Sequence, residues 1–110
     1  MHELAITQSV VDAVTERTGS APVTSVRLRV GLLAGIVPDA MRFCFELVTA
    51  GTPLEGAALE FEQPEGRGLC RTCGAEFVLA DLILLCDCGS ADVEVLAGRE
   101  LAVASVVLAS

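Results

Sequence analysis

The chain has 110 residues, the size of one small domain, and its net charge of −8 comes from fifteen acidic residues against seven basic ones. So acidic a surface repels phosphate backbones and anionic lipid head groups, which argues against nucleic acid or a membrane as a partner. No apolar run approaches the ~20 residues that span a bilayer and the start lacks a cationic signal-peptide region, so we expect a cytoplasmic protein with reduced cysteines.

The first half of the chain predicts two helices and two strands in alternation. Residues 4–18 and 39–50 place apolar side chains at helical spacing, and Pro38 suits a first helical turn. Residues 26–32 and 58–62 alternate apolar with polar side chains, which indicates strands with one buried face. The apolar positions expected to face the core are Leu4, Val10, Val11 and Val14 in the first helix and Met41, Cys44, Phe45 and Val48 in the second.

The sequence changes character at residues 63–68, a turn-rich stretch that marks the best internal boundary. Four of the five cysteines follow it, and residues 101–107 then return to a strand pattern. We therefore predict an α+β fold in which two helices cover a three-stranded antiparallel sheet, with a four-cysteine zinc-ribbon domain inserted. The predicted domains are residues 1–65 together with 98–110, and residues 66–97.

Two cysteine pairs carry the ligand pattern of a metal site. Cys70 and Cys73 form a C-x-x-C pair followed by glycine, and Cys86 and Cys88 form a C-x-C pair, one residue shorter than the usual second pair. Four thiolates suit a structural zinc ion, although rubredoxin-like iron uses the same ligands and a redox pair or free core thiols are further alternatives. A hairpin would bring the pairs together, with strands that include Phe77, Val78, Leu82 and Leu84.

The amino terminus offers a second ligand set, and it contains His2, the single histidine. The Met1 amine, the His2 amide nitrogen and the His2 imidazole can form a planar chelate, which suits Ni(II) or Cu(II). Glu3 or Asp39 could fill further positions. The ordinary alternative is a frayed terminus in which Glu3 is a carboxylate stabilised at a helix N-terminus.

The combined motifs resemble the HypA/HybF family of hydrogenase-maturation nickel metallochaperones. These motifs are Met1-His2-Glu3 entering a helix, Cys70-x-x-Cys73-Gly74, a second cysteine pair followed by Gly89-Ser90, Glu46 at the end of residues 43–46, and the runs 51–57 and 98–101. The resemblance implies a nickel-binding α/β domain with an inserted zinc domain and no enzymatic activity.

The resemblance also implies a role for each site residue. Met1 and His2 would supply nitrogen ligands for transiently bound Ni(II), with Glu3 as a ligand or neighbour and Asp39 as a further ligand. The structural Zn(II) ligands would be Cys70, Cys73, Cys86 and Cys88. The implied partners are the hydrogenase-maturation GTPase, the [NiFe]-hydrogenase large subunit and, in a weak homodimer, a second copy of the chain.

Two other functions remain open from the residues alone. The chain could be a structural zinc-ribbon adaptor for a protein partner, with His2 incidental. It could also be a thiol redox enzyme that uses Cys86 and Cys88, although no basic residue adjoins Cys86 to lower its pKa.

Overall fold

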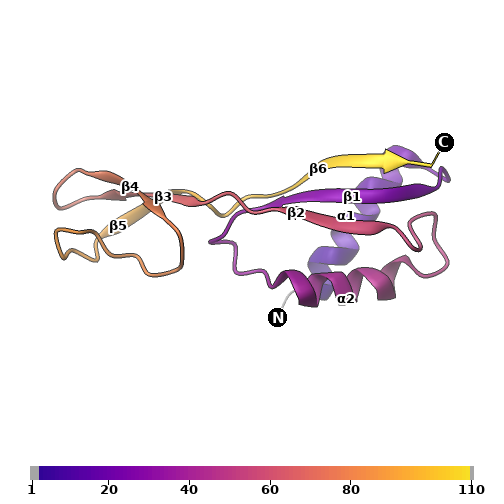
Figure 1. Cartoon of the computed structure of the whole chain (residues 1–110), viewed down its shortest axis with the longest axis horizontal. Helices are drawn as coiled ribbons and strands as arrows, with labels where there is room; N and C mark the ends of the chain where they lie inside the picture. Colours follow the sequence, from indigo (N-terminus) through magenta and orange to yellow (C-terminus); the bar gives the residue numbers. More distant parts are fainter. Residues whose placement is uncertain (1–2, 110) are drawn as a thin grey trace. The chain divides into compact units, whose positions relative to one another are not determined.

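The computed structural model describes residues 3–109, which form two helices and six strands (Figure 1). The described residues separate into two compact units. The helical unit comprises residues 3–28, 36–61 and 102–109, and the cysteine unit comprises residues 29–35 and 62–101. The elements are α1 (Glu3–Thr18), β1 (Val23–Val30), α2 (Pro38–Thr49), β2 (Ala58–Glu62), β3 (Gly66–Cys70), β4 (Glu76–Leu79), β5 (Val93–Ala97) and β6 (Leu101–Leu108).

Both predicted helices are present and pack against each other. Helix α1 ends at Thr18, and the following Gly19 has a positive φ of 62° that suits glycine and an N–H that donates to the Thr15 carbonyl. The prediction that Leu4 faces the core was wrong, since its side chain is exposed, and Cys44 is only half-buried. The apolar helical residues that are buried are Val10, Val11, Val14, Met41 and Phe45.

One sheet has the strand order β2-β1-β6 and joins the three predicted strands. Strand β6 runs antiparallel to β1, because Thr24 bonds to Val107 and Pro22 to Ala109. Strand β2 runs parallel to β1, because the ion pairs Arg27–Glu60 and Arg29–Glu62 advance together along both strands. The predicted all-antiparallel sheet was therefore wrong, and the sheet is mixed.

The parallel pairing follows from the connection between the two strands. Helix α2 lies between β1 and β2 in the chain. A helical connection brings the chain back to the end of the sheet at which the first strand began, so the second strand runs in the same direction as the first. Side chains of β1 alternate, so that Val26 and Leu28 are buried while Arg27 and Arg29 are exposed. The helices therefore lie on one face of this sheet, as Figure 1 shows, and the arginines lie on the other.

The cysteine unit contains a second sheet, with the strand order β4-β3-β5 and antiparallel pairing throughout. Strand β3 occupies part of the stretch predicted as turn, and β5 was not predicted. Phe77 and Val78 lie in β4 as expected, but Leu82 and Leu84 lie in the loop that follows. The buried core of this unit comprises Leu33, Cys70, Leu79, Cys86 and Val93.

Three glycines allow close backbone approach where chain segments meet in the cysteine unit. A Cβ atom at Gly31 would lie 2.0 Å from the Gly98 carbonyl oxygen, and one at Gly98 would lie 2.6 Å from the Gly66 Cα. Real Cβ atoms do not approach so closely. Glycine is therefore required here for packing, and at Gly98 also for a φ of 118°.

Candidate metal centre

The four predicted cysteine ligands lie together in the cysteine unit. All four sulfur atoms lie within 4.8 Å of one another, and the pairs Cys70–Cys88 and Cys73–Cys86 have Sγ–Sγ distances of 3.7 Å. Four sulfurs bound at about 2.3 Å to one tetrahedral ion stand about 3.8 Å apart. The donor set therefore fits a single tetrahedral metal that prefers thiolate, and the shortened C-x-C pair does not prevent convergence.

Each cysteine pair is followed by a glycine that turns the backbone. Gly74 has a φ of 78° and its N–H donates to the Cys70 carbonyl at 2.8 Å. Gly89 has a φ of 91° and donates to the Cys86 carbonyl at 2.9 Å. The two turns are closed by equivalent hydrogen bonds even though the spacing of the pairs differs.

The four thiols differ in burial. Cys70 and Cys86 are buried in the core of the unit, whereas Cys73 and Cys88 are exposed. Each pair thus supplies one inner and one outer sulfur. The inner pair fixes the site to the sheet, and the outer pair leaves one side of it open to solvent.

The thiols at Cys70 and Cys86 also differ in acidity. The Cys73 N–H donates to the Cys70 sulfur and lowers the pKa of Cys70 from 9.0 to about 6. At Cys86 the N–H of Cys88 acts in the same direction, but burial and the neighbouring thiols outweigh it and raise the pKa to about 12. A bound metal must therefore displace a proton from Cys86 near neutral pH, and such a thiol is a poor redox nucleophile.

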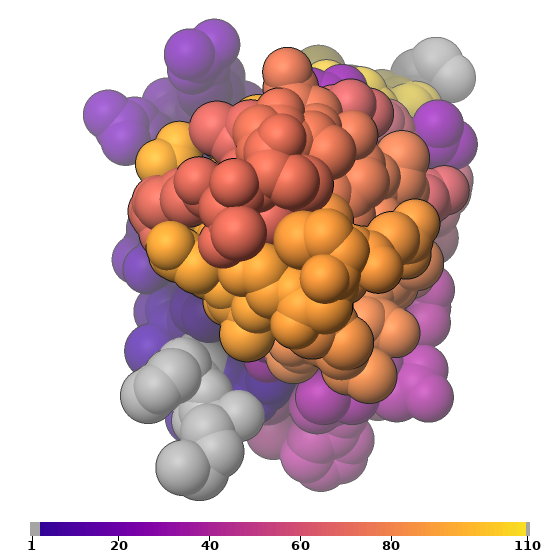
Figure 2. Space-filling model, turned by 90° about the vertical axis from the view of Figure 1, so that its left-hand side faces the viewer, coloured from indigo at the N-terminus to yellow at the C-terminus, as the bar shows by residue number. Residues whose placement is uncertain are grey.

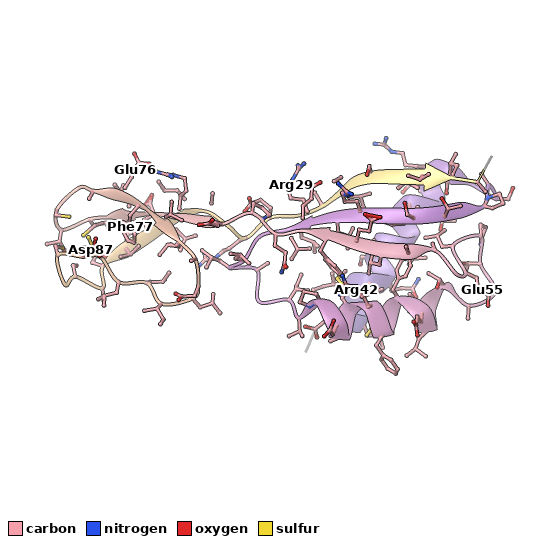
Figure 3. All side chains as sticks on the ribbon, viewed as in Figure 1. Arg29, Arg42, Glu55, Glu76, Phe77 and Asp87 are labelled. Atoms are coloured by element: carbon pink, nitrogen blue, oxygen red, sulfur yellow. The ribbon has the colours of Figure 1, made fainter. Side chains whose placement is uncertain are left out.

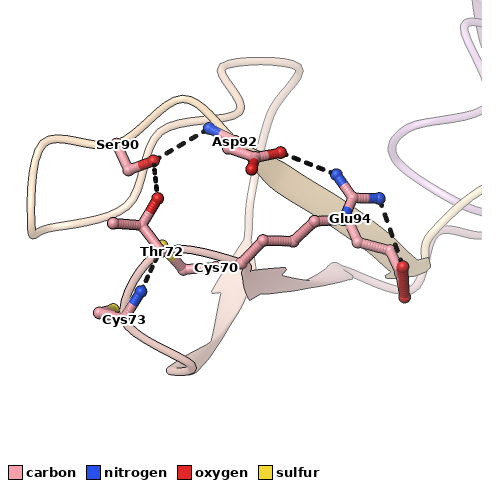
Figure 4. Close-up of polar contacts among 7 residues, drawn as sticks. Cys70, Thr72, Cys73, Ser90, Asp92 and Glu94 are labelled. Atoms are coloured by element: carbon pink, nitrogen blue, oxygen red, sulfur yellow. Dashed lines mark hydrogen bonds and ion pairs between the residues drawn. The ribbon is translucent and has the colours of Figure 1, made fainter.

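A polar network joins the two cysteine turns (Figure 4). The Thr72 and Ser90 hydroxyl oxygens lie 2.8 Å apart, and Ser90 Oγ also accepts the Asp92 N–H at 3.1 Å. The Arg71 guanidinium pairs with Asp92 at 2.9 Å and with Glu94 at 3.3 Å. Sequence reasoning missed these supporting residues, although the serine after Gly89 was a visible signal.

The predicted nickel ligands are placed only in part. Met1 and His2 lie outside the described residues. Glu3 is buried at the start of α1, and its carboxylate accepts the N–H of Val37, the residue before α2, at 3.5 Å. Val37 has no side-chain oxygen with which to cap α2. The hydrogen bond from the Val37 N–H to the Glu3 carboxylate links the starts of both helices.

Asp39 lies in the first turn of α2, and 95% of its side chain is exposed. It pairs with Arg42 at 3.3 Å. Arg42 in turn lies 4.8 Å from the centre of the Phe61 ring and donates to the Leu59 carbonyl at 3.4 Å, which fixes its position between α2 and β2 (Figure 3). Asp39 lies two residues after Val37, which contacts Glu3. Because its side chain is exposed, Asp39 is accessible to a ligand.

Comparison with known proteins decides the family. A family model described as hydrogenase/urease nickel incorporation, metallochaperone, hypA, matches residues 1–108. The chain belongs to the HypA family. The resemblance noted from the motifs is confirmed, and the family is one of metallochaperones, not of enzymes.

Relatives agree over most of the chain. The hydrogenase maturation factor HypA of Geotalea uraniireducens is 49% identical over 104 residues, covering 94% of each chain. That of Nostoc punctiforme is 45% identical over 106 residues, covering 96% of this chain and 94% of its own. The solution structure of the Ni metallochaperone HypA from Helicobacter pylori, at 18% identity, has a TM-score of 0.65 over 98% of this chain and 97% of its own, so the fold is shared.

Within residues 3–109, no helix is long and apolar enough to cross a membrane.

Proposed function

We propose that this HypA-family chain binds Ni(II) through the Met1 amine, the His2 amide nitrogen and the His2 imidazole. Family membership over residues 1–108 is the observation that carries the proposal. Glu3 supports it, because its contact with Val37 holds the first described turn of α1 beside the start of α2, where Asp39 lies. We propose Glu3 and Asp39 as the oxygen ligands that complete the nickel site.

The Cys70, Cys73, Cys86 and Cys88 cluster holds zinc in this proposal. Zinc, when bound, supplies a cross-link that stabilises a unit with so small an apolar core. The protein contributes preformed sulfur positions and a polar network that ties the two turns together. The site is structural, because four protein ligands leave no position for a substrate.

Delivery of nickel would involve the maturation GTPase and the [NiFe]-hydrogenase large subunit in the cytoplasm. A terminal site with few protein ligands suits transfer, because each bond to nickel can be replaced in turn by a ligand of the acceptor. The adaptor alternative shares the cysteine unit but assigns no function to His2.

Nickel titration of the untagged protein tests the proposal. The unmodified chain is expected to bind one Ni(II), while acetylation of the amine or the substitution His2→Ala abolishes tight binding and leaves zinc content unchanged. Glu16→Ala, an exposed change on α1, is the matched control and should bind normally. Equal binding by His2→Ala and the unmodified chain would contradict the proposal and favour the adaptor.

A further inference from the structure

The cysteine unit displays an apolar loop, residues 80–85, between β4 and Cys86. Leu82, Ile83 and Leu85 are 64%, 69% and 52% exposed. Figure 2 is a space-filling view in which the surface of the cysteine unit faces the viewer, in orange tones. Three large aliphatic side chains so close in the chain form an exposed cluster of a kind that marks interaction sites.

The loop has a defined conformation despite its exposure. Leu84 is half-buried and packs against the core that contains Leu79 and Cys86. The Asp81 carboxylate accepts the Ile83 N–H at 2.9 Å, and the Leu85 N–H donates to the Ile83 carbonyl at 3.1 Å. Packing of the loop thus requires one apolar residue, Leu84, and leaves the other three presented to solvent without a structural need.

The charges near the loop limit what can cover it. Asp81 lies exposed within the loop, and Asp87, which is labelled in Figure 3, is exposed directly after Cys86. A second copy of the chain would bring the same acidic groups against these, and nucleic acid or an anionic membrane would add further negative charge to a chain of net charge −8. An apolar pocket rimmed by arginine or lysine complements the loop in both shape and charge.

We propose that the apolar loop docks into a basic-rimmed apolar pocket on a protein partner. The surface follows from the exposed residues and their charges, whereas the choice of the maturation GTPase and the hydrogenase large subunit as probes rests on the proposed function. The loop belongs to the cysteine unit and the proposed nickel ligands do not. Docking and nickel binding can therefore be measured separately.

The test compares two double variants of equal character. Leu82→Ser with Ile83→Ser removes the two most exposed side chains of the loop. Phe43→Ser with Leu47→Ser removes two side chains of similar exposure, 63% and 58%, from α2. Affinity for the GTPase and for the large subunit is measured for each zinc-loaded protein, together with zinc content and nickel titration.

The loop variant is expected to bind at least one probe about tenfold or more weakly, as loss of central apolar contacts does. The α2 variant should keep its affinity, and both variants should keep zinc and nickel binding. Asp81→Asn, which keeps an oxygen acceptor for the Ile83 N–H, should lower the association rate and reduce its salt dependence. If the loop variant loses zinc, Ile83→Ser alone replaces it.

The proposal is overturned if neither probe binds the unmodified chain, if the loop variant binds as well as the unmodified chain, or if the α2 variant loses as much. Sedimentation that shows a dimer dissociated by the loop substitutions would assign the loop to a second copy instead. If the unmodified chain binds no nickel, the proposed function is contradicted, whereas the docking measurement remains valid.

Discussion

The Thr72 hydroxyl lies 2.8 Å from the Ser90 hydroxyl and bridges the two cysteine turns. Thr72 belongs to the first turn, between Cys70 and Cys73. Ser90 follows the second, and its carbonyl accepts the Cys86 N–H at 2.9 Å. One short contact between side chains thus connects two segments that each supply two sulfurs.

We expect this contact to slow the loss of zinc, so that its removal makes zinc transfer faster. Thr72→Val and Ser90→Ala should each speed transfer of zinc to a chelator about five- to tenfold, which corresponds to a hydrogen bond of about 1 kcal/mol. The double variant should be little faster than Ser90→Ala alone, since Ser90→Ala already removes the contact with Thr72 together with the bond from the Asp92 N–H. Thr15→Val, which removes a hydroxyl from α1, is the control and should leave the rate unchanged. Additive effects of the two substitutions would show that the hydroxyls act separately.

Removal of one outer sulfur should destabilise one unit selectively. Cys73 is exposed, so Cys73→Ser creates no core cavity and acts through the metal alone. Hydrogen exchange in residues 66–97 should become much faster, while the helical circular dichroism of α1 and α2 is retained. Full retention of zinc by Cys73→Ser would contradict the four-cysteine site.

Gly31→Ala should destabilise the protein through a steric clash. The added Cβ would lie 2.0 Å from the Gly98 carbonyl oxygen, so the two backbones must separate. We expect a loss of about 3 kcal/mol or more in the free energy of unfolding. Gly19→Ala is the control, because open space surrounds that Cβ and only its φ of 62° is unfavourable, at about 1 kcal/mol. Urea unfolding of both variants measures the difference.

The sequence was sufficient for elements in which a strong period and a terminator coincide. Helix α1 was expected over residues 4–18 and is found at Glu3–Thr18, and α2 was expected over 39–50 and is found at Pro38–Thr49. The direction of β2 could also have been predicted, because a helix between two neighbouring strands favours parallel pairing. The antiparallel expectation overlooked that signal.

Strand β3 could not be predicted from local preference. Its Gly66 and Gly68 are poor strand formers, yet a Cβ at Gly68 would lie 2.9 Å from Val93 and 3.0 Å from Leu79. Tertiary packing selects small residues there, and the sequence alone does not contain those neighbours. For the metal site, the ligand residues could be predicted from cysteine spacing, whereas the Arg71, Asp92 and Glu94 network depends on the pairing of β3 with β5.

The stability of the metal-free protein should pass through a maximum near pH 9. The pKa of Cys70 is lowered from 9.0 to about 6, so between these values the unfolded state binds more protons and stability rises with pH. The pKa of Cys86 is raised from 9.0 to about 12, so above pH 9 the folded state binds more protons and stability falls as pH increases. Carboxylates do not titrate in this window.

Thermal melting of the reduced, chelator-treated protein at pH 6, 9 and 11 measures this dependence. The melting temperature should be highest at the middle value. A melting temperature that falls steadily from pH 6 upwards would contradict the lowered pKa of Cys70, and the zinc-loaded protein should lack the maximum because all four sulfurs are then thiolates.

Glu3 should have a structural role that can be separated from any role at nickel. Its buried carboxylate accepts the Val37 N–H, so Glu3→Ala removes the link between the starts of α1 and α2 and should lower the urea midpoint. Glu3→Gln keeps an oxygen acceptor of the same reach and should restore most of that stability. The exposed substitution Glu16→Ala on the same helix should leave the midpoint unchanged.

Nickel titration of Glu3→Gln then isolates the ligand role, because the amide is a far weaker nickel ligand than the carboxylate. Weaker binding or an altered d–d spectrum in this stable variant would identify Glu3 as a ligand, whereas unchanged binding would assign it to the helix junction alone.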